Sequence, residues 1–169
     1  MAQAVISTIV GMVCKDGVIL GTEKVVVSEM TVPASDHRIY TITKQIGMVV
    51  TGVIPDGRAL VERAKEEGAS FQKQYGIPIS GKILAERLSQ YMHMNTLYLW
   101  ARPFGCTVVI AAFEEAKGPS LFMIDSGGLC YSYFGCSSGK GRQIARNEIE
   151  NLVPKNITCK EAAFNMAKM

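Results

Sequence analysis

One apolar run limits the folds open to this chain: Thr107-Val108-Val109-Ile110-Ala111-Ala112 contains six consecutive uncharged residues. Successive side chains of a β-strand point to opposite faces of its sheet, so a strand of this composition needs cover on both faces. Shorter β-branched runs occur before and after the middle of the chain. We therefore expect two blocks of strands whose sheets are packed on both sides.

Turn residues separate these runs into individual strands. Asp16-Gly17, for example, is a strong hairpin turn signal between two of them. The predicted strands of the first block cover residues 8–14, 18–22, 25–27, 38–43 and 47–53, and those of the second block cover 106–113, 121–124 and 129–134. The first block contains short antiparallel strands.

The residues between the two blocks predict two helices. Pro55 suits the first turn of the first helix, which Gly76 and Pro78 end. Ser80 is a candidate N-cap of the second helix, which ends before Pro103. Residues at helical spacing mark the expected inner face of each helix: Leu60, Ala64, Gly68, Phe71 and Tyr75 in the first, and Leu84, Leu88, Tyr91, Asn95 and Tyr98 in the second.

Two further helices are predicted near the C-terminus. One runs from about Gly141 to Leu152, and the other begins at Thr158, which forms a T-x-x-E capping box with Glu161. Runs of strands and runs of helices that do not alternate one by one predict an α+β fold with antiparallel sheets. We expect a four-layer α-β-β-α sandwich with two antiparallel sheets between helix layers.

Length and charge favour one domain that binds neither nucleic acid nor membrane. The 169 residues fit a single domain covering 1–169. Eighteen basic and fifteen acidic residues leave a net charge of +3, with no block of like charges. No uncharged stretch reaches the roughly 18 residues of a membrane span. The first residues lack the basic region of a signal peptide.

The cysteines predict buried thiols of a cytosolic protein rather than a disulfide framework. They are Cys14, Cys106, Cys130, Cys136 and Cys159, and none belongs to a C-x-x-C pair. His37 and His93 have no cysteine or carboxylate at ligand spacing. We therefore expect neither a metal site nor a cofactor.

No active site follows from the residue pattern alone. Residues 135–141, GCSSGKG, are similar to a phosphate-binding loop, but three residues rather than four separate the glycines. Gly141 also follows Lys140, where a serine or threonine would hold magnesium. We interpret the segment as a tight strand-to-helix turn, with nucleotide binding as the lesser alternative. The sequence contains no G-x-S-x-G motif and no recognisable Ser/His/Asp or Cys/His set.

Several longer segments resemble the proteasome alpha subunits. They are GMVCKDGVILGTEK at 11–24, RIY at 38–40, IGM at 46–48, TGVIPDGR at 51–58, YLWARPFGC at 98–106 and FMIDSGG at 122–128. The resemblance begins at about Ser7 and continues through nearly all of the chain, in the family's order of elements. Gly135-Cys136 and Cys159-Lys160 favour the eukaryotic alpha type 3 branch.

The resemblance implies the N-terminal-nucleophile hydrolase fold, which is the same four-layer sandwich. The active members are proteasome beta subunits, in which an N-terminal threonine attacks the peptide carbonyl and its own amine acts as the base. By position, Ser7 corresponds to that threonine and Glu23 to an acidic residue. Arg38 corresponds to the lysine and Ser138 to a supporting serine.

Two departures from the active pattern predict a chain without catalysis. Ser7 follows Ala4-Val5-Ile6, with no Gly-Thr cleavage junction. Arg38 keeps its proton where the active members have a tunable lysine. We therefore expect a non-catalytic structural subunit of a threonine-type endopeptidase complex. The alternative is an active N-terminal-nucleophile peptidase of the beta type, using threonine or serine; an unrelated α+β binding domain is a weaker one.

The resemblance also implies partners and a place in the cell. Alpha subunits form seven-membered outer rings that gate substrate entry, stack on beta-subunit rings and dock regulatory particles or activators. The complex carries out ATP- and ubiquitin-dependent protein degradation in the cytoplasm and nucleus. The family's N-terminal segment is not matched here, and the chain ends within the family's fourth helix. We therefore expect a single alpha-type domain truncated at both ends, about two thirds of a subunit.

One candidate binding site follows from the same resemblance. Regulators of the family insert a C-terminal tail between neighbouring alpha subunits, where a lysine receives the tail's carboxylate. Arg38 occupies that lysine's position, and Gly52 and Val53 match the glycine and the apolar wall of the pocket. We expect these residues to form a regulator-docking pocket. The alternative is that Arg38 is structural and pairs with Asp36 or with a neighbour's carboxylate.

Overall fold

The computed structural model describes residues 7–26, 28–30, 32, 35, 37–152 and 157–168. The strands in these ranges are β1 (Ile9–Val13), β2 (Val18–Thr22), β3 (Ile39–Thr43), β4 (Ile46–Gly52), β5 (Cys106–Glu114), β6 (Gly118–Ile124), β7 (Cys130–Ser132) and β8 (Gly135–Ser138). The helices are α1 (Ile54–Tyr75), α2 (Gly81–Leu97), α3 (Arg142–Leu152) and α4 (Cys159–Met166). None of these helices is both long and apolar enough to cross a membrane.

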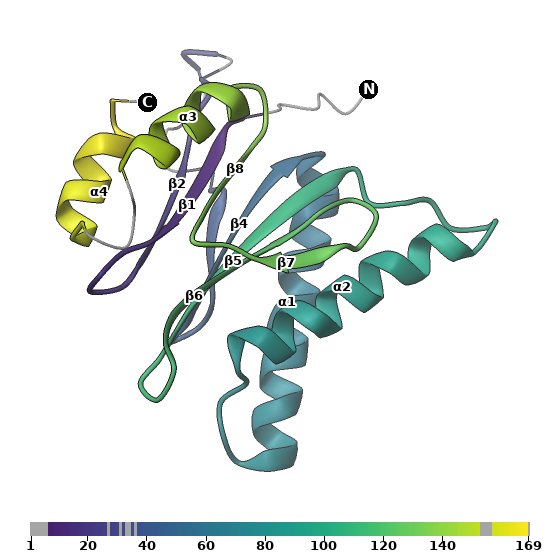
Figure 1. Ribbon diagram of the computed structural model, residues 1–169. Helices are drawn as coiled ribbons and strands as arrows, with labels where there is room; N and C mark the ends of the chain where they lie inside the picture. The colour runs from purple at the N-terminus through teal and green to yellow at the C-terminus, as the bar shows by residue number, and fades with distance from the viewer. Residues whose placement is uncertain are drawn as a thin grey trace.

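The strands form two antiparallel sheets that lie face to face. One sheet has the order β2-β1-β8 and the other has the order β3-β4-β5-β6-β7. Helices α1 and α2 cover the outer face of the larger sheet, and α3 and α4 cover the smaller sheet (Figure 1). The expected four-layer α-β-β-α sandwich is therefore confirmed.

Three apolar clusters fill the spaces between the four layers. The largest, which includes Leu60 and Leu84, lies between the larger sheet and α1 and α2. A second cluster, including Ile9 and Leu121, lies between the two sheets. The third, which includes Met12, lies under α3 and α4. Each layer therefore buries an apolar face, which is the main source of stability for such a sandwich.

Strand β5 confirms the expectation drawn from its apolar run. Val108 and Ile110 are fully buried in the cluster under the helices. Val109 and Ala111, on the opposite face, belong to the cluster between the sheets. The alternation of a strand thus divides one uninterrupted apolar run between two cores.

Two of the predicted strands and one predicted turn differ from the structure. Val25 and Val26 lie outside any strand and are 37% and 67% exposed, while Val27 lies outside the described residues. The predicted strand 129–134 is shorter, and the chain then enters β8, which pairs with β1 in the other sheet. This pairing places Cys136 opposite Gly11 and buries it, so the first half of the expected strand-to-helix turn is a strand.

The inner face of α2 is rotated relative to the predicted one. Leu84 and Leu88 are buried as expected, but Met92 completes the face with no exposed surface. Tyr91 and Tyr98 are 36% and 46% exposed, so they lie off that face. In α1, by contrast, only Tyr75 departs from the predicted stripe, since the other members are buried.

The N-cap predicted for α2 is wrong, whereas the capping box predicted for α4 is confirmed. The Ser80 side chain makes no cap hydrogen bond; it donates to Glu114 Oε1 at 2.7 Å. The same oxygen accepts from the Gly81 amide at 3.0 Å, so a carboxylate from β5 caps the helix. At α4, the Thr158–Glu161 capping box is present as predicted.

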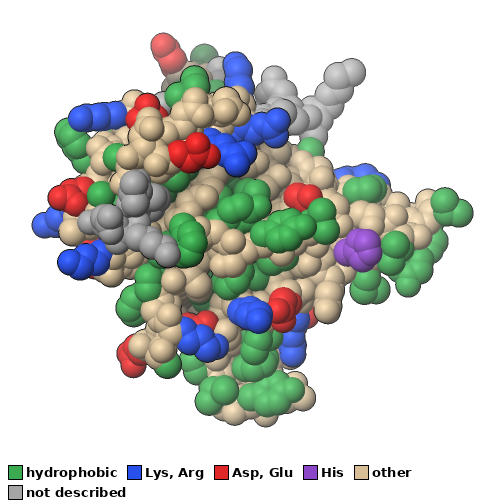
Figure 2. Space-filling view, viewed as in Figure 1, with side chains coloured by type: hydrophobic (Ala, Val, Ile, Leu, Met, Phe, Trp, Pro, Cys, Tyr) green, Lys and Arg blue, Asp and Glu red, His purple; other side chains and the backbone are tan. Residues whose placement is uncertain are grey.

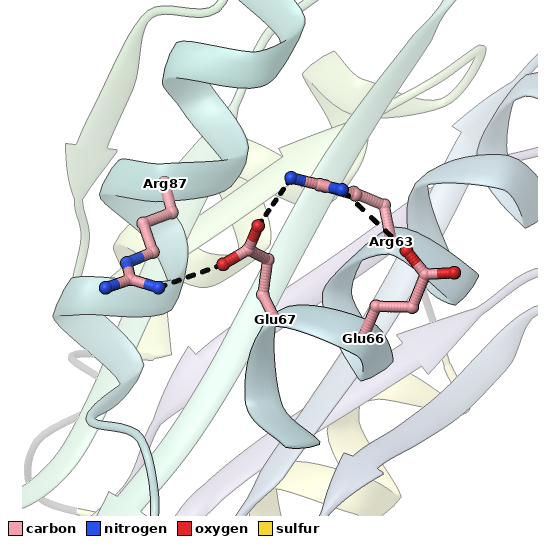
Figure 3. A network of polar contacts seen from close by, with 4 residues as sticks. All are labelled: Arg63, Glu66, Glu67 and Arg87. Carbon is pink, nitrogen blue, oxygen red and sulfur yellow. Dashed lines mark hydrogen bonds and ion pairs between the residues drawn. The ribbon is translucent and has the colours of Figure 1, made fainter. Parts of the chain in front are cut away.

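A charged network joins α1 to α2 on the outer surface (Figure 3). Glu67 of α1 accepts from Arg63 at 2.6 Å within its own helix and from Arg87 of α2 at 3.0 Å. Glu66 lies farther from Arg63, at 3.8 Å. Glu67 therefore links the two helices, whereas Glu66 contributes only within α1.

Candidate functional site

The candidate site lies where the start of β1 meets the ends of β4 and β8. Ser7, just before β1, accepts a hydrogen bond on its carbonyl oxygen from the hydroxyl of Thr51 in β4. Gly139 follows β8 with a φ of 106°, and a Cβ there would lie 2.2 Å from the Ser7 carbonyl oxygen. Only glycine allows this approach. The pairing of Ile9 with Ser138 brings the predicted Ser7 and Ser138 positions into one region.

Thr8, rather than Ser7, contacts the predicted acidic residue. Glu23 Oε2 accepts from the Thr8 amide at 3.2 Å and from Thr8 Oγ1 at 3.0 Å. Thr8 Oγ1 in turn accepts from the Gly141 amide at 3.0 Å. The Gly141 amide thus donates to a side chain of the protein itself rather than being left for a phosphate. This favours the interpretation of residues 139–141 as a turn.

The charges around Glu23 favour its ionised form. The Thr8 hydrogen bonds lower the pKa of Glu23 most, and the positive charges of Lys140 and Arg38 lower it further. Arg38 is only 6% exposed. The charge of Arg38 thus acts on Glu23, although less than the Thr8 hydrogen bonds do.

Ser7 is poorly placed for nucleophilic catalysis. It has no exposed surface, and its Oγ has no hydrogen-bond partner within the part of the chain that the structure describes. An active serine needs a base in contact and access to the substrate carbonyl. In the sequence given, the Ser7 nitrogen belongs to a peptide bond with Ile6, so it is not the free amine that serves as base in the active members.

The predicted docking residues lie at one end of the larger sheet. Arg38 precedes β3, and antiparallel pairing of β3 with β4 brings that start near the end of β4, where Gly52 lies. Gly52 has a φ of 112°, and a Cβ there would lie 2.4 Å from the Gly105 carbonyl oxygen. The Val53 amide donates to the same oxygen at 2.9 Å. The alternative partner Asp36 lies outside the described residues.

An ion pair that holds this corner together was not predicted. Asp56, in the first turn of α1, accepts two hydrogen bonds of 2.6 Å from Arg102 and one of 3.0 Å from the Gly105 amide. The Arg102 hydrogen bonds lower the pKa of Asp56, against the opposing effect of burial. Asp56 and Arg102 both lie in segments that resemble the family, and this resemblance was the only sequence signal that could have pointed to the pair. The pair fixes the loop on which Val53 rests.

Comparisons with known proteins agree with this structure. The sequence model of the family described as "Proteasome subunit" matches residues 6–169. A rice protein, proteasome subunit alpha type-3, is 48% identical over 162 residues, which cover 96% of this chain and 65% of the relative. The Arabidopsis thaliana protein of the same name is 44% identical with the same coverage. A probable proteasome subunit alpha type-7 of Schizosaccharomyces pombe is 41% identical, covering 96% of this chain and 64% of the relative.

The chain thus spans about 65% of the length of the relatives it matches. Their names confirm the expected alpha type rather than the beta type, and the alpha type 3 branch in particular. With the family match over nearly every residue and the four-layer sandwich, the chain belongs to the proteasome subunit family, in its eukaryotic alpha type 3 branch.

Proposed function

We propose that this chain acts as a non-catalytic structural subunit of the proteasome core particle. The observation that carries the proposal is the closed environment of Ser7: its side chain is fully buried and its carbonyl is held by Thr51. The position of the family's nucleophile is therefore a packing position in this chain. Arg38 in place of the lysine supports the same conclusion, because arginine stays protonated at every relevant pH.

The subunit's place would be the seven-membered outer alpha ring, stacked on a ring of beta subunits. There it would help to gate substrate entry and to dock a regulatory particle or activator, in ATP- and ubiquitin-dependent protein degradation. The cytoplasm and nucleus are the proposed locations. The names of the relatives, all alpha subunits, support this placement.

An exposed apolar surface at the end of α2 supports assembly with other chains. Leu97, Leu99 and Trp100 are 64%, 106% and 84% exposed, and Tyr98 stacks on Trp100 at 5.0 Å. Figure 2 shows hydrophobic side chains gathered on the projection at the right, which Figure 1 identifies as the end of α2 and the loop after it. Large exposed aromatic and apolar side chains of this kind mark protein–protein contacts.

Assembly and activity together test the proposal. The full-length gene product, co-expressed with other alpha subunits, is expected to give a seven-membered ring in native mass spectrometry. The 169-residue chain is expected to leave a fluorogenic peptide uncleaved, both as it stands and as Ser7→Ala. Turnover that disappears in Ser7→Ala would refute the structural role and establish the alternative, a beta-type peptidase.

Regulator docking at Arg38, Gly52 and Val53 is a second part of the proposal. Arginine can hold a carboxylate with two parallel hydrogen bonds. Arg38 is 6% exposed within this chain, so a tail must reach it from the end of the sheet rather than across an open surface. Val53 is partly exposed at the same end and supplies the apolar wall.

The docking role is tested in an assembled ring that carries Arg38→Ala. Binding of a regulator tail is expected to weaken by about 1.5–3 kcal/mol, the range for a hydrogen bond to a charged group. Arg146→Ala is the matched control, because Arg146 is an exposed arginine of α3 that pairs with Glu150. Unchanged affinity in Arg38→Ala, with the ring intact, would leave Arg38 as a structural residue that supports Glu23.

A further inference from the structure

We propose that Cys14 and Cys159 form an oxidisable thiol pair, a modification site whose disulfide would tie the first turn of α4 to the β1–β2 hairpin. Cys14 directly follows β1 and Cys159 is the first residue of α4. Cys14 belongs to the apolar cluster under α3 and α4, and Cys159 packs against the same cluster, so the fold brings the two thiols together although 144 residues lie between them in the sequence.

Backbone contacts hold the two thiols in this position. The Lys15 amide donates to the Ile157 carbonyl at 3.1 Å, and the Cys159 amide donates to Asp16 Oδ1 at 2.8 Å. These bonds flank Cys14 and Cys159 on both segments. Because the hairpin and the helix start are fixed to each other, the thiols meet as part of the fold rather than by chance fluctuation.

The two sulfur atoms differ in access to a reagent. Cys14 is 2% exposed and belongs to the apolar cluster under α3 and α4. Cys159 packs against that cluster but is only partly buried. A small oxidant from solvent therefore meets Cys159 first, and Cys14 is placed behind it to react second.

The surroundings keep both thiols protonated under ordinary conditions. Burial raises the pKa of Cys14. Burial, followed by the hydrogen bond to Asp16, raises the pKa of Cys159 to about 12, although helix N-termini generally favour a thiolate. Asp16 itself stays ionised, because its hydrogen bonds with Cys159 lower its pKa. Little thiolate is therefore present at neutral pH, and we expect the pair to react slowly with an oxidant.

Hydrogen peroxide is an oxidant of the right size and class. The Cys159 sulfur, after losing its proton, attacks one peroxide oxygen and displaces hydroxide, which leaves as water and gives a sulfenic acid. The Cys14 sulfur then attacks the sulfenic sulfur, and the hydroxyl leaves as water with the proton of the second thiol. Two thiols and one peroxide become one disulfide and two waters, with two electrons passing from sulfur to oxygen.

Peptide mapping of the full 169-residue chain tests the proposal. After native treatment with hydrogen peroxide and alkylation of the remaining thiols, we expect one peptide pair linked through Cys14 and Cys159. Its mass should be about 2 Da below the sum of the two free peptides, for the two hydrogens removed. Sulfinic acid at Cys159 with Cys14 still open to alkylation, or disulfides only between chains, would overturn the proposal.

Three variants sharpen the experiment. Cys159→Ser is expected to abolish the linked peptide. Cys130→Ser is the matched control, because Cys130 is also partly buried but has Glu86 as its charged neighbour, and it should leave the link unchanged. Asp16→Asn keeps an oxygen for the Cys159 amide and removes the charge, so the link should form about three- to fourfold faster for each unit by which the thiol pKa falls, because the gain in thiolate is partly offset by its lower nucleophilicity. An unchanged rate would overturn the role given to Asp16.

Discussion

Glu23 accepts two hydrogen bonds from a single residue, Thr8, through its backbone amide at 3.2 Å and its hydroxyl at 3.0 Å. A third hydrogen bond runs in the opposite direction, because the Glu23 amide donates to the Thr8 carbonyl at 2.8 Å. The carboxylate at the acidic position of the family's active site therefore accepts hydrogen bonds from within this chain. A carboxylate held in this way fixes the start of β1 beside the end of β2.

Thr8→Val should release Glu23 from its hydroxyl donor. The pKa of Glu23 is then expected to rise toward its ordinary value, because a hydrogen bond that favours the charged form is lost. Thr22→Val is the control, since the Thr22 hydroxyl donates to the Glu23 carbonyl rather than to its carboxylate. An NMR titration of the side-chain carboxyl carbons measures both. An unshifted Glu23 in Thr8→Val would show that the hydroxyl has no such effect.

Asp56→Ala should destabilise the chain more than Arg102→Ala. Asp56 is 6% exposed and binds both Arg102 and the Gly105 amide, whereas the Arg102 side chain is 70% exposed. Loss of these bonds from a buried carboxylate should lower the free energy of unfolding by about 1.5–3 kcal/mol. Urea denaturation measures this value. Glu150→Ala, at an exposed ion pair of α3, should cost about 0.5 kcal/mol or less.

The same carboxylate predicts sensitivity to acid. The pKa of Asp56 is lowered in the folded state, so its contribution to stability is present above the unfolded-state pKa, about 3.9. That contribution is lost as the pH falls through the lower folded-state value. Urea midpoints measured at descending pH should therefore converge for the parent chain and Asp56→Asn. A constant difference between them down to the acid limit would contradict this origin of the stability.

Local patterns were enough to predict the layers of the fold. The apolar run of β5 required cover on both faces, and Val108 and Val109 indeed enter different cores. The capping box at Thr158 was also predicted, because its donor and acceptor lie within one turn of chain. These features depend on residues that are close in sequence, so local sequence patterns are enough to predict them.

Features made by distant residues could not be predicted in this way. The cap of α2 comes from Glu114 of β5, and Thr8 meets Gly141 only because β1 pairs with β8. In α2, Tyr91 and Met92 both lie at helical spacing from Leu88, three and four residues on. The larger sheet decides between them, and Met92 is the one buried. Register and pairing across layers therefore set the site.

Met92→Ala tests the rotated face of α2. Met92 is fully buried in the largest core, so its truncation should lower the free energy of unfolding by about 2–5 kcal/mol. Met94→Ala, two residues further along the helix, is the control, because Met94 is 51% exposed and its loss should change stability by about 0.5 kcal/mol or less. Denaturant unfolding measures both. Equal effects would contradict the observed orientation of the helix.

Glu67→Ala tests the link between α1 and α2. The Glu67 side chain is 19% exposed and contacts arginines of both helices, so its removal should cost about 1 kcal/mol. Glu66→Ala removes a carboxylate that is 70% exposed and 3.8 Å from Arg63, and should have almost no effect. Thermal melts of the two variants provide the comparison. Similar melting temperatures for both would mean that Glu67 does not connect the helices energetically.

The isolated 169-residue chain should associate with itself. Within the described residues, no strand pairs with the outer edge of β2, and such an edge can recruit another chain. A hollow of about 750 Å³ lies beside it, lined in part by Val10, Ile144 and Met166.

Ile144→Lys should therefore reduce the association, because Ile144 is 65% exposed at that hollow. Ile77→Lys, which changes a similarly exposed residue just beyond α1, should leave it unchanged. Size-exclusion chromatography with light scattering over a range of concentrations measures the mass of each chain. A monodisperse parent monomer with a cooperative melt would show that the β2 edge and the hollow are protected within a single chain.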